Sequence, residues 1–235
     1  MPSGASDLSV SVQDVLARHP FFQNLPPDAK TLLAQKVIKK SLRRGAVIFS
    51  EGDLGIGLVG VLRGSVKIRV TSAGGREVVF NIMNAGDVFG EIALLDGRSR
   101  SADAIAMSDC ELMNIDRTTF VAVMKSHPDV ALRVIEFLCA RLRRTSEQVQ
   151  DSTFLDAPAR LAKTLLYLSG ESAAGQPRTA NVTQQEISQM IGISREMTNK
   201  LLRSWTRANL VKLERGSIVI LRATQLREIA AEDAG

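Results

Sequence analysis

The chain has 235 residues, of which 45% are hydrophobic, so it suits one large domain or two smaller ones with apolar cores. Thirty Lys and Arg residues against 25 Asp and Glu leave a formal charge of +5, a mild excess that is compatible with nucleic acid as a partner. Only 4% of the residues are aromatic, which argues against a protein that binds single strands by stacking on their bases. Neither a membrane-spanning apolar run nor a charged-then-apolar leader is found, so we expect a cytoplasmic protein that makes no use of a membrane.

The beginning of the chain predicts a short leader followed by two helices. Residues 1–11 are small and polar, as in a frayed terminus. Apolar residues at helical spacing predict helices over 12–18 and 27–36. Pro26-Pro27 opens the second helix, because proline is tolerated in a first turn.

The period of the apolar residues changes to two between residues 41 and 116. Short strands are predicted there at 47–49, 58–62, 66–70 and 78–82. Glycines separate the strands at turn-like intervals, and Gly74-Gly75 predicts a hairpin. Many short strands at this spacing favour a sandwich or a barrel.

The stretch from Gly86 to Ala102, GDVFGEIALLDGRSRSA, has the residues of a small anion pocket. Gly86 and Gly90 allow a tight turn and a close backbone approach, because glycine has no Cβ. Glu91 is a good acceptor for a ribose hydroxyl, and Arg100 offers a planar fork of donors to phosphate oxygens. The stretch therefore predicts a site for a phosphate attached to a sugar. The alternative is a surface turn with a solvated Arg-Ser-Arg tip.

The longest predicted helix begins after His127-Pro128. Its apolar residues and one threonine recur in steps of four and three, at Ala131, Ile135, Leu138, Leu142, Thr145 and Val149. This heptad spacing is typical of a helix that pairs with another helix. A helix packed on its own barrel is the alternative, which three heptads leave open. Its place between two domains favours a parallel homodimer through residues 129–151.

A hinge is predicted after the long helix, at residues 154–158. Asp156 is placed to cap a new helix that runs to about Ser169, with proline tolerated in its first turn. Residues 170–178 are rich in Gly, Ser, Ala and Pro and predict a loop.

The remaining pattern predicts a helix-turn-helix with a wing. Thr183 and Glu186 form a capping box that opens one helix, and Ser194 caps the next. Two short strands at 211–213 and 218–221, joined by Glu-Arg-Gly-Ser, supply the wing.

The helix after Ser194 separates its side chains into two faces. Met197, Leu201, Trp205 and Ala208 are expected on the buried face. The opposite face carries Arg195, Glu196, Asn199, Lys200, Arg203 and Arg207. These are side chains that base edges demand, since Arg and Lys pair with guanine and Glu with the amino group of cytosine. A solvated surface helix is the alternative, but it does not explain the turn and the capping box that precede it.

Two sequence motifs resemble one known family. Phe-Gly-Glu-Ile-Ala-Leu, a spacer and Arg-Ser-Ala resemble the phosphate-binding cassette of cyclic-nucleotide-binding domains, and residues from about 12 to 222 resemble the CRP/FNR family of bacterial transcription regulators. The resemblance implies an α+β chain with a β-roll (jelly-roll) sensor domain over 1–128, a dimerisation helix and hinge over 129–155, and a winged helix-turn-helix domain over 156–235. One departure is the glycine-rich segment 55–60, which puts the edge packing of its strand in question.

The resemblance also implies which residues bind what. For the cyclic nucleotide these are Gly90, Glu91, Ile92, Ala93, Arg100 and Ser101 in the cassette, with Thr145 and Ser146 meeting the purine, one from each subunit. For double-stranded DNA, Arg195, Glu196 and Lys200 would read bases beside Asn199, with Thr183, Gln185, Ser194 and Arg203 nearer phosphates. The implied target is a near-palindromic site with a half-site like TGTGA. Lys200 stands where relatives usually have arginine, so it lacks the bidentate fork.

Three functions follow from this reading. The first is a dimeric regulator switched by cyclic AMP, the second the same regulator taking cyclic GMP or both, and the third a subunit that controls an enzyme or channel, which would have no DNA-binding unit. RNA polymerase is the further partner that the family implies. We favour cyclic AMP.

Metal, haem and catalytic chemistry are not expected. The iron–sulfur type of sensor needs cysteines near the N-terminus, and the haem type needs a histidine within the roll, whereas His19 and His127 lie outside it. Cys110 and Cys139 are far apart and are expected to be small buried hydrophobes. No nucleophile–base pair appears, so we expect no enzyme.

Overall fold

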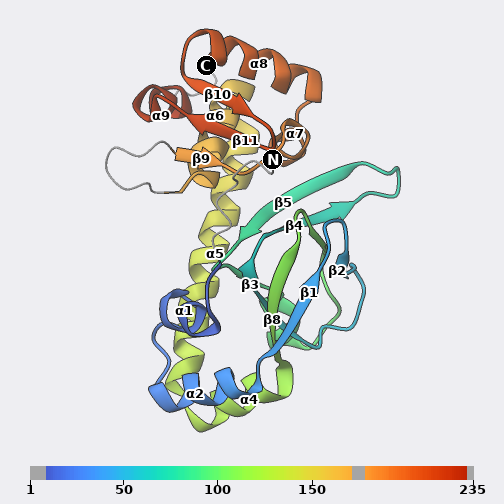
Figure 1. The fold of residues 1–235 in the computed structure, drawn as a ribbon, viewed down its shortest axis with the longest axis vertical. Coiled ribbons are helices and arrows are strands. Elements are labelled where there is room, and N and C mark those ends of the chain that lie inside the picture. Colours follow the sequence, from blue (N-terminus) through green and yellow to red (C-terminus); the bar gives the residue numbers. More distant parts are fainter. Residues whose placement is uncertain (1–8, 171–177, 232–235) are drawn as a thin grey trace. The chain divides into compact units, whose positions relative to one another are not determined.

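The computed structural model describes residues 9–170 and 178–231, which fall into two compact units (Figure 1). The first unit comprises residues 1–70 and 80–142, and the second comprises residues 71–79 and 143–235. Most of the leader expected at 1–11 and of the loop expected at 170–178 lies outside the described residues. The domain boundaries expected at 128 and 155 stay predictions.

Two four-stranded sheets form the roll of the first unit. One sheet has the order β1 (Ile38–Leu42), β8 (Cys110–Asp116), β3 (Gly57–Arg63) and β6 (Val88–Phe89). The other has the order β2 (Val47–Phe49), β7 (Asp103–Ala106), β4 (Ser65–Thr71) and β5 (Glu77–Asn84). The strand pairs with a described register are antiparallel. The sequence prediction of a roll of short strands is therefore confirmed.

Strand β3 is buried on both faces and joins two hydrophobic cores. Val59 and Val61 belong to a core between the two sheets, and Leu58 and Leu62 to a core between the first sheet and the helices. These helices are α1 (Val12–Arg18), α2 (Pro27–Lys36), α4 (Arg117–Ser126) and the start of α5 (Asp129–Phe154). Because successive side chains of a strand point to opposite faces, each face of β3 contributes to one of the two cores.

The glycines of β3 serve close packing inside the sheet. The question raised for the edge of this strand was misplaced, because β3 lies between β8 and β6. A Cβ at Gly60 would lie 2.7 Å from the Cε atom of Met113, and one at Gly57 would lie 2.5 Å from the carbonyl oxygen of Ile115. Glycine is thus required at Gly57, where the obstacle is backbone, whereas a side chain at Gly60 would displace that of Met113.

Helix α5 has a buried face and an exposed apolar stripe. Val130 and Val134 are buried in the core of the first unit, whereas Ile135, Leu142 and Val149 are more than half exposed. The interpretation of a helix packed on its own roll is therefore confirmed for one face, and the homodimer through the exposed stripe stays a prediction. Cys139 is exposed in the single chain, so the prediction that it is buried was wrong. It does not lie on the face of α5 that carries Val130 and Val134.

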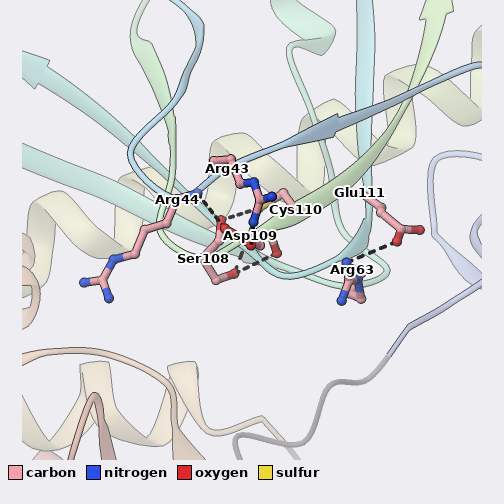
Figure 2. Close-up of polar contacts among 7 residues, drawn as sticks. All are labelled: Arg43, Arg44, Arg63, Ser108, Asp109, Cys110 and Glu111. Atoms are coloured by element: carbon pink, nitrogen blue, oxygen red, sulfur yellow. Dashed lines mark hydrogen bonds and ion pairs between the residues drawn. The ribbon is translucent and has the colours of Figure 1, made fainter. Parts of the chain in front are cut away.

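Polar contacts join three turns at one end of the roll (Figure 2). Asp109 accepts hydrogen bonds from the backbone N–H of Arg44 at 2.9 Å and from Nη1 of Arg43 at 3.2 Å. The thiol of Cys110, buried as expected, donates to the carbonyl oxygen of Ser65 at 3.3 Å. Of these contacts, the one from the Arg44 N–H satisfies a backbone group of a turn.

Asp116 caps helix α4 and gives the first unit a titratable contribution to stability. The hydroxyl and the backbone N–H of Thr119 donate to its carboxylate and lower the pKa of Asp116 from 3.8 to about 2. We expect Asp116→Ala to lower the free energy of unfolding by about 1 kcal/mol at neutral pH. Because the pKa of Asp116 is lower in the folded protein, this contribution is fully present above pH 3.8 and is lost as the pH falls toward about 2. Urea unfolding of both proteins across that range measures it, and a constant difference would contradict the role.

The second unit packs helices against a small sheet. Helices α6 (Ala157–Leu168), α7 (Gln184–Ile191), α8 (Arg195–Arg207) and α9 (Ala223–Ala231) accompany the sheet β10 (Val211–Glu214), β11 (Ser217–Ile220) and β9 (Arg178–Ala180). The predicted helix-turn-helix and wing are confirmed, and β9 and α9 are additions. The capping box is present, with Thr183 Oγ1 accepting from Glu186 N and Glu186 Oε2 from Thr183 N. Ser194 caps α8 through Met197 N at 3.1 Å.

The buried face of α8 differs from the expected one. Thr198, Leu202 and Trp205 are buried, at a spacing of four and three residues, whereas Met197 is 45% exposed. Met197 precedes Thr198 by one residue and so points about 100° away from the core. Thr198 is accommodated because its hydroxyl donates to the carbonyl oxygen of Ser194 at 3.1 Å.

Candidate functional site

The cassette residues of the first unit surround one cavity of about 50 Å³. Its lining consists of Phe49, Ile68, Phe89, Gly90, Glu91, Ile92, Ala93, Arg100, Ser101, Ala102 and Arg141. All six residues expected in the cassette are therefore brought together. A site for a small organic ligand usually holds several hundred cubic ångströms. Side chains of the lining must therefore move apart before a nucleotide can enter.

Glu91 contributes a buried carboxylate to this cavity. It is the first residue of α3 (Glu91–Asp96), which follows Gly90 in the left-handed conformation, and it is 2% exposed. Its Oε2 atom lies 3.0 Å from Nη1 of Arg141, whose side chain is 34% exposed. Burial of a carboxylate is costly without such a partner.

The charge of Arg141 also affects the pKa values of two other residues, His19 and Asp87. Burial lowers the pKa of His19 to about 4, and the charge of Arg141 acts in the same direction. His19 is therefore neutral at physiological pH and packs as an aromatic ring against Phe22 and Phe137. Burial raises the pKa of Asp87, and Arg141 opposes that rise. Arg141 is thus one cation of this partly buried polar region.

Arg100 contributes a buried cation to the same cavity. It is 6% exposed, and it donates from Nη1 to the Gly90 carbonyl at 3.0 Å and from Nη2 to the Gly57 carbonyl at 2.7 Å. Its buried Nε has no hydrogen-bond partner. Burial lowers the pKa of Arg100, opposed by Glu91 and Asp53, but a guanidinium stays charged at physiological pH.

Gly90 is required by its conformation and by its neighbour. Its φ is +81°, and a Cβ would lie 2.5 Å from Nη1 of Arg100. Any side chain at this position would strain the backbone and displace the guanidinium. Glycine at position 90 therefore leaves the space that the guanidinium of Arg100 occupies.

Other sequence-predicted ligand residues lie outside this cavity. Thr145 and Ser146 lie on the part of α5 that belongs to the second unit, and both are exposed. Their contact with a purine stays a prediction.

Five members of the cavity lining were not among the predicted ligand residues: Ile68, Phe89 and Ala102, and the two that contact the charged groups, Phe49 and Arg141. Arg141 lies four residues before Thr145, hence on the same side of α5, and this spacing could have revealed it. Phe49 ends a short alternating strand, where no local signal distinguishes a ligand site from a core position.

Loss of Arg141 is expected to destabilise the first unit. Arg141→Ala leaves the Glu91 carboxylate buried without its cation, and we expect the free energy of unfolding to fall by about 2 kcal/mol, less than for a fully buried pair because the arginine is partly exposed. Glu91→Gln removes the uncompensated charge, so the second substitution should restore most of the loss in urea unfolding. Arg143→Ala, at an exposed position of the same helix, is the control. An equal loss in the Glu91→Gln background would assign the effect to packing of the arginine stem.

The second unit gathers the residues expected to bind DNA around the start of its two central helices. Arg195, Glu196, Lys200 and Arg203 are exposed on α8, and Asn199 is half-buried. A cavity of about 220 Å³ is lined by Thr183, Gln185 and Arg195 together with residues of the wing, among them Glu214 and Ser217. The wing therefore joins the surface that sequence reasoning assigned to the two helices. DNA contact by each residue stays a prediction.

Residues 9–170 and 178–231 contain no metal-binding cluster and no membrane-spanning helix. No group of three His, Cys, Asp or Glu side chains there could hold a metal ion. No helix in the same ranges has the length and apolarity needed to cross a membrane.

Two segments of the chain match known domain families. Residues 39–127 match the cyclic nucleotide-binding domain, and residues 159–229 match the Crp-like helix-turn-helix domain. The first match contains Glu91, Arg100 and every other residue that lines the cavity except Arg141, and the second contains α7, α8 and the wing.

Known proteins are similar to this chain over most of its length. The chain is 32% identical over 219 residues to a CRP-like cAMP-activated global transcriptional regulator of Mycobacterium tuberculosis, covering 92% of this chain and 98% of that protein. It is 31% identical to the catabolite activator protein of Thermus thermophilus, with a TM-score of 0.52 and coverage of 90% and 98%. The c-di-GMP responsive global regulator CLP of Xanthomonas campestris shares the fold, with a TM-score of 0.68 at 23% identity and coverage of 83% and 99%.

Proposed function

Because the chain belongs to the CRP family of cyclic-nucleotide-binding, DNA-binding transcription regulators, which are not enzymes, we propose that cyclic AMP is its ligand and promotes its binding to DNA. The ligand would occupy the cavity of the first unit. A dimer would then bind a near-palindromic site through two copies of α8. The sensor domain would span residues 1–128, the dimerisation helix and hinge 129–155, and the DNA-binding domain 156–235.

The observation that carries this proposal is the pairing of a buried cation and a buried carboxylate in one cavity. Arg100 has a buried Nε without a hydrogen-bond partner, the donor that a phosphate oxygen would satisfy. Glu91 offers acceptor oxygens for a ribose hydroxyl once its contact with Arg141 loosens. A ribose that carries a cyclic phosphate presents a phosphate oxygen for Arg100 and a hydroxyl for Glu91 a short distance apart.

A homodimer is the assembly that the exposed stripe of α5 favours. Ile135, Leu142 and Val149 repeat at heptad spacing and are each more than half exposed in the single chain. A parallel partner helix would bury all three and give the DNA-binding surface a two-fold axis. RNA polymerase as a further partner and a cytoplasmic location complete the proposal on the family likeness.

Cyclic GMP is the second candidate ligand, alone or beside cyclic AMP. Ser101 could meet the extra amino group of guanine, and the hydroxyls of Thr145 and Ser146 can donate or accept by rotating. We favour cyclic AMP because the Mycobacterium tuberculosis relative is named for it.

Calorimetric titration of the full-length protein tests the ligand directly. Cyclic AMP should bind with one site per chain and more tightly than cyclic GMP. It should also raise the affinity for a palindromic DNA containing TGTGA half-sites, measured by fluorescence anisotropy. Binding of c-di-GMP but of neither cyclic mononucleotide would overturn the proposal.

Thr145 is the residue that we expect to couple the ligand to the long helix. It lies at a position of the heptad seam, where its hydroxyl could donate to or accept from a bound purine. Thr145→Leu should keep or strengthen dimerisation and still bind cyclic AMP, yet show a smaller rise in DNA affinity on its addition. Thr153→Leu makes the same chemical change at an exposed position further along α5 and is the control. A wild-type response in Thr145→Leu would show that the seam is not the switch.

A further inference from the structure

The guanidinium of Arg100 is held along its edge by two backbone carbonyls. Nη1 donates to Gly90 at 3.0 Å and Nη2 donates to Gly57 at 2.7 Å, while the buried Nε is left without a hydrogen-bond partner. Hydrogen bonds in the plane of a guanidinium fix its edge but do not support its two faces. A further contact is therefore needed to fix the plane of the group.

The ring of Phe49 supplies this contact on one face. The Cζ atom of Arg100 lies 4.1 Å from the centroid of the ring. The face of an aromatic ring carries negative potential and attracts a cation, more strongly where water is excluded. Arg100 is only 6% exposed, so the contact lies in such a place.

The ring of Phe49 is itself fixed by the roll. Phe49 ends β2 and pairs with Ala104 of β7. Its ring packs at 5.8 Å and a tilt of 46° on the ring of Phe89, which is 1% exposed. The ring therefore packs on the cavity wall at Phe89 and lines the same cavity as Glu91.

We propose that Phe49 is a positioning residue for cyclic nucleotide binding, whose ring holds the guanidinium of Arg100 inside the cavity before the ligand arrives. The inference rests on the proposed function, since it needs the cyclic phosphate at Arg100. An arginine that is already ordered loses less side-chain freedom on binding, which raises the affinity. A leucine at this position fills much of the same volume but offers no negative face to the cation.

Titration of cyclic AMP into four proteins tests the role of the ring. Phe49→Leu should weaken binding about five- to thirtyfold, the range expected for a desolvated cation–π contact. Phe49→Tyr keeps the ring face and should stay within about twofold of the wild type. Phe80→Leu makes the same change at a 51% exposed phenylalanine outside the cavity and should have no effect.

A double-mutant cycle separates positioning from packing. In an Arg100→Gln background, Phe49→Leu should cause no further loss of affinity, because the cation that it positions is absent. A second readout uses the two phosphorothioate diastereomers of cyclic AMP, in which sulfur replaces one or the other exocyclic oxygen. Phe49→Leu should reduce the wild-type preference between them. This ratio is measured within one protein and does not depend on the folded fraction.

Each result decides between two readings. An equal loss in both backgrounds, or an unchanged diastereomer ratio, would show that Phe49 acts only as packing and would overturn the inference. Binding by the wild type with no effect of Phe49→Leu would overturn it as well and leave the proposed function standing. A wild type that binds no cyclic nucleotide would refute the proposed function and, with it, the premise of the inference.

Discussion

Replacing Arg100 with leucine is expected to weaken the binding of cyclic AMP by about 2–5 kcal/mol, or tens- to thousandfold in affinity. The guanidinium is buried in the cavity, and its unpaired Nε is the donor that a phosphate oxygen would satisfy. Without it the cyclic phosphate would be buried beside Glu91 with no cation of the cassette to compensate it. Cyclic-AMP-dependent DNA binding should be lost with it, as calorimetry and fluorescence anisotropy can show.

The control for this variant lies two residues earlier in the chain. Arg98 is exposed and lines no part of the cavity, so Arg98→Leu removes the same charge from the same loop. It should leave the affinity for cyclic AMP unchanged. Circular dichroism should show the wild-type fold in both variants. An unchanged affinity in Arg100→Leu would remove Arg100 from the proposed site.

The second large effect is expected at the start of α8. Arg195 is exposed in the first turn after the Ser194 cap and borders the cavity shared with the wing. If it pairs with a guanine, Arg195→Ala should cost about 1–3 kcal/mol per half-site, and the two half-sites of a dimer should lose roughly twice that. Fluorescence anisotropy with cyclic AMP present measures the loss. Arg227→Ala, at an exposed position of α9, is the control.

Selection from random DNA identifies what α8 reads. The wild type should return a two-fold motif with half-sites like TGTGA, and Arg195→Ala should lose the preference at one position of each half-site. Lys200→Arg restores a bidentate fork and should sharpen the preference at another position. An asymmetric motif, or no motif, would refute the assignment of α8 as the reading helix.

The cassette could be predicted from the sequence because its residues are nearly contiguous. The turn at Gly90 and the short helix that follows bring Glu91 and Arg100 to one cavity by local geometry alone. Arg141 could not be found in the same way, because it reaches Glu91 from a helix far along the chain. Its four-residue spacing from Thr145 indicates its side of α5, but its pairing with Glu91 depends on how α5 packs against the roll.

The faces of two helices, α5 and α8, were also hard to predict from the spacing of apolar residues. The heptad on α5 was visible, but the same helix buries Val130 and Val134 on another face, so periodicity could not choose between two partners. On α8 the apolar face was misplaced by one residue, because a buried threonine with a satisfied hydroxyl replaced an expected methionine. Hydrophobicity alone does not reveal a polar side chain that finds its hydrogen bond within the helix.

The pairing of β1 with β8 has a consequence for synthesis on the ribosome. Ile38 pairs with Asn114 and Leu42 with Cys110, so the first sheet cannot close until almost the whole roll has emerged. Such distant pairings carry a large loop-closure entropy and form slowly. Until then the apolar side chains of β3 remain without the strand that covers them, a state in which a nascent chain is open to aggregation or to chaperones. In the second unit β10 and β11 are joined by a tight turn and can pair as soon as they are made. Slowing translation after residue 116 should therefore raise the soluble yield of the chain.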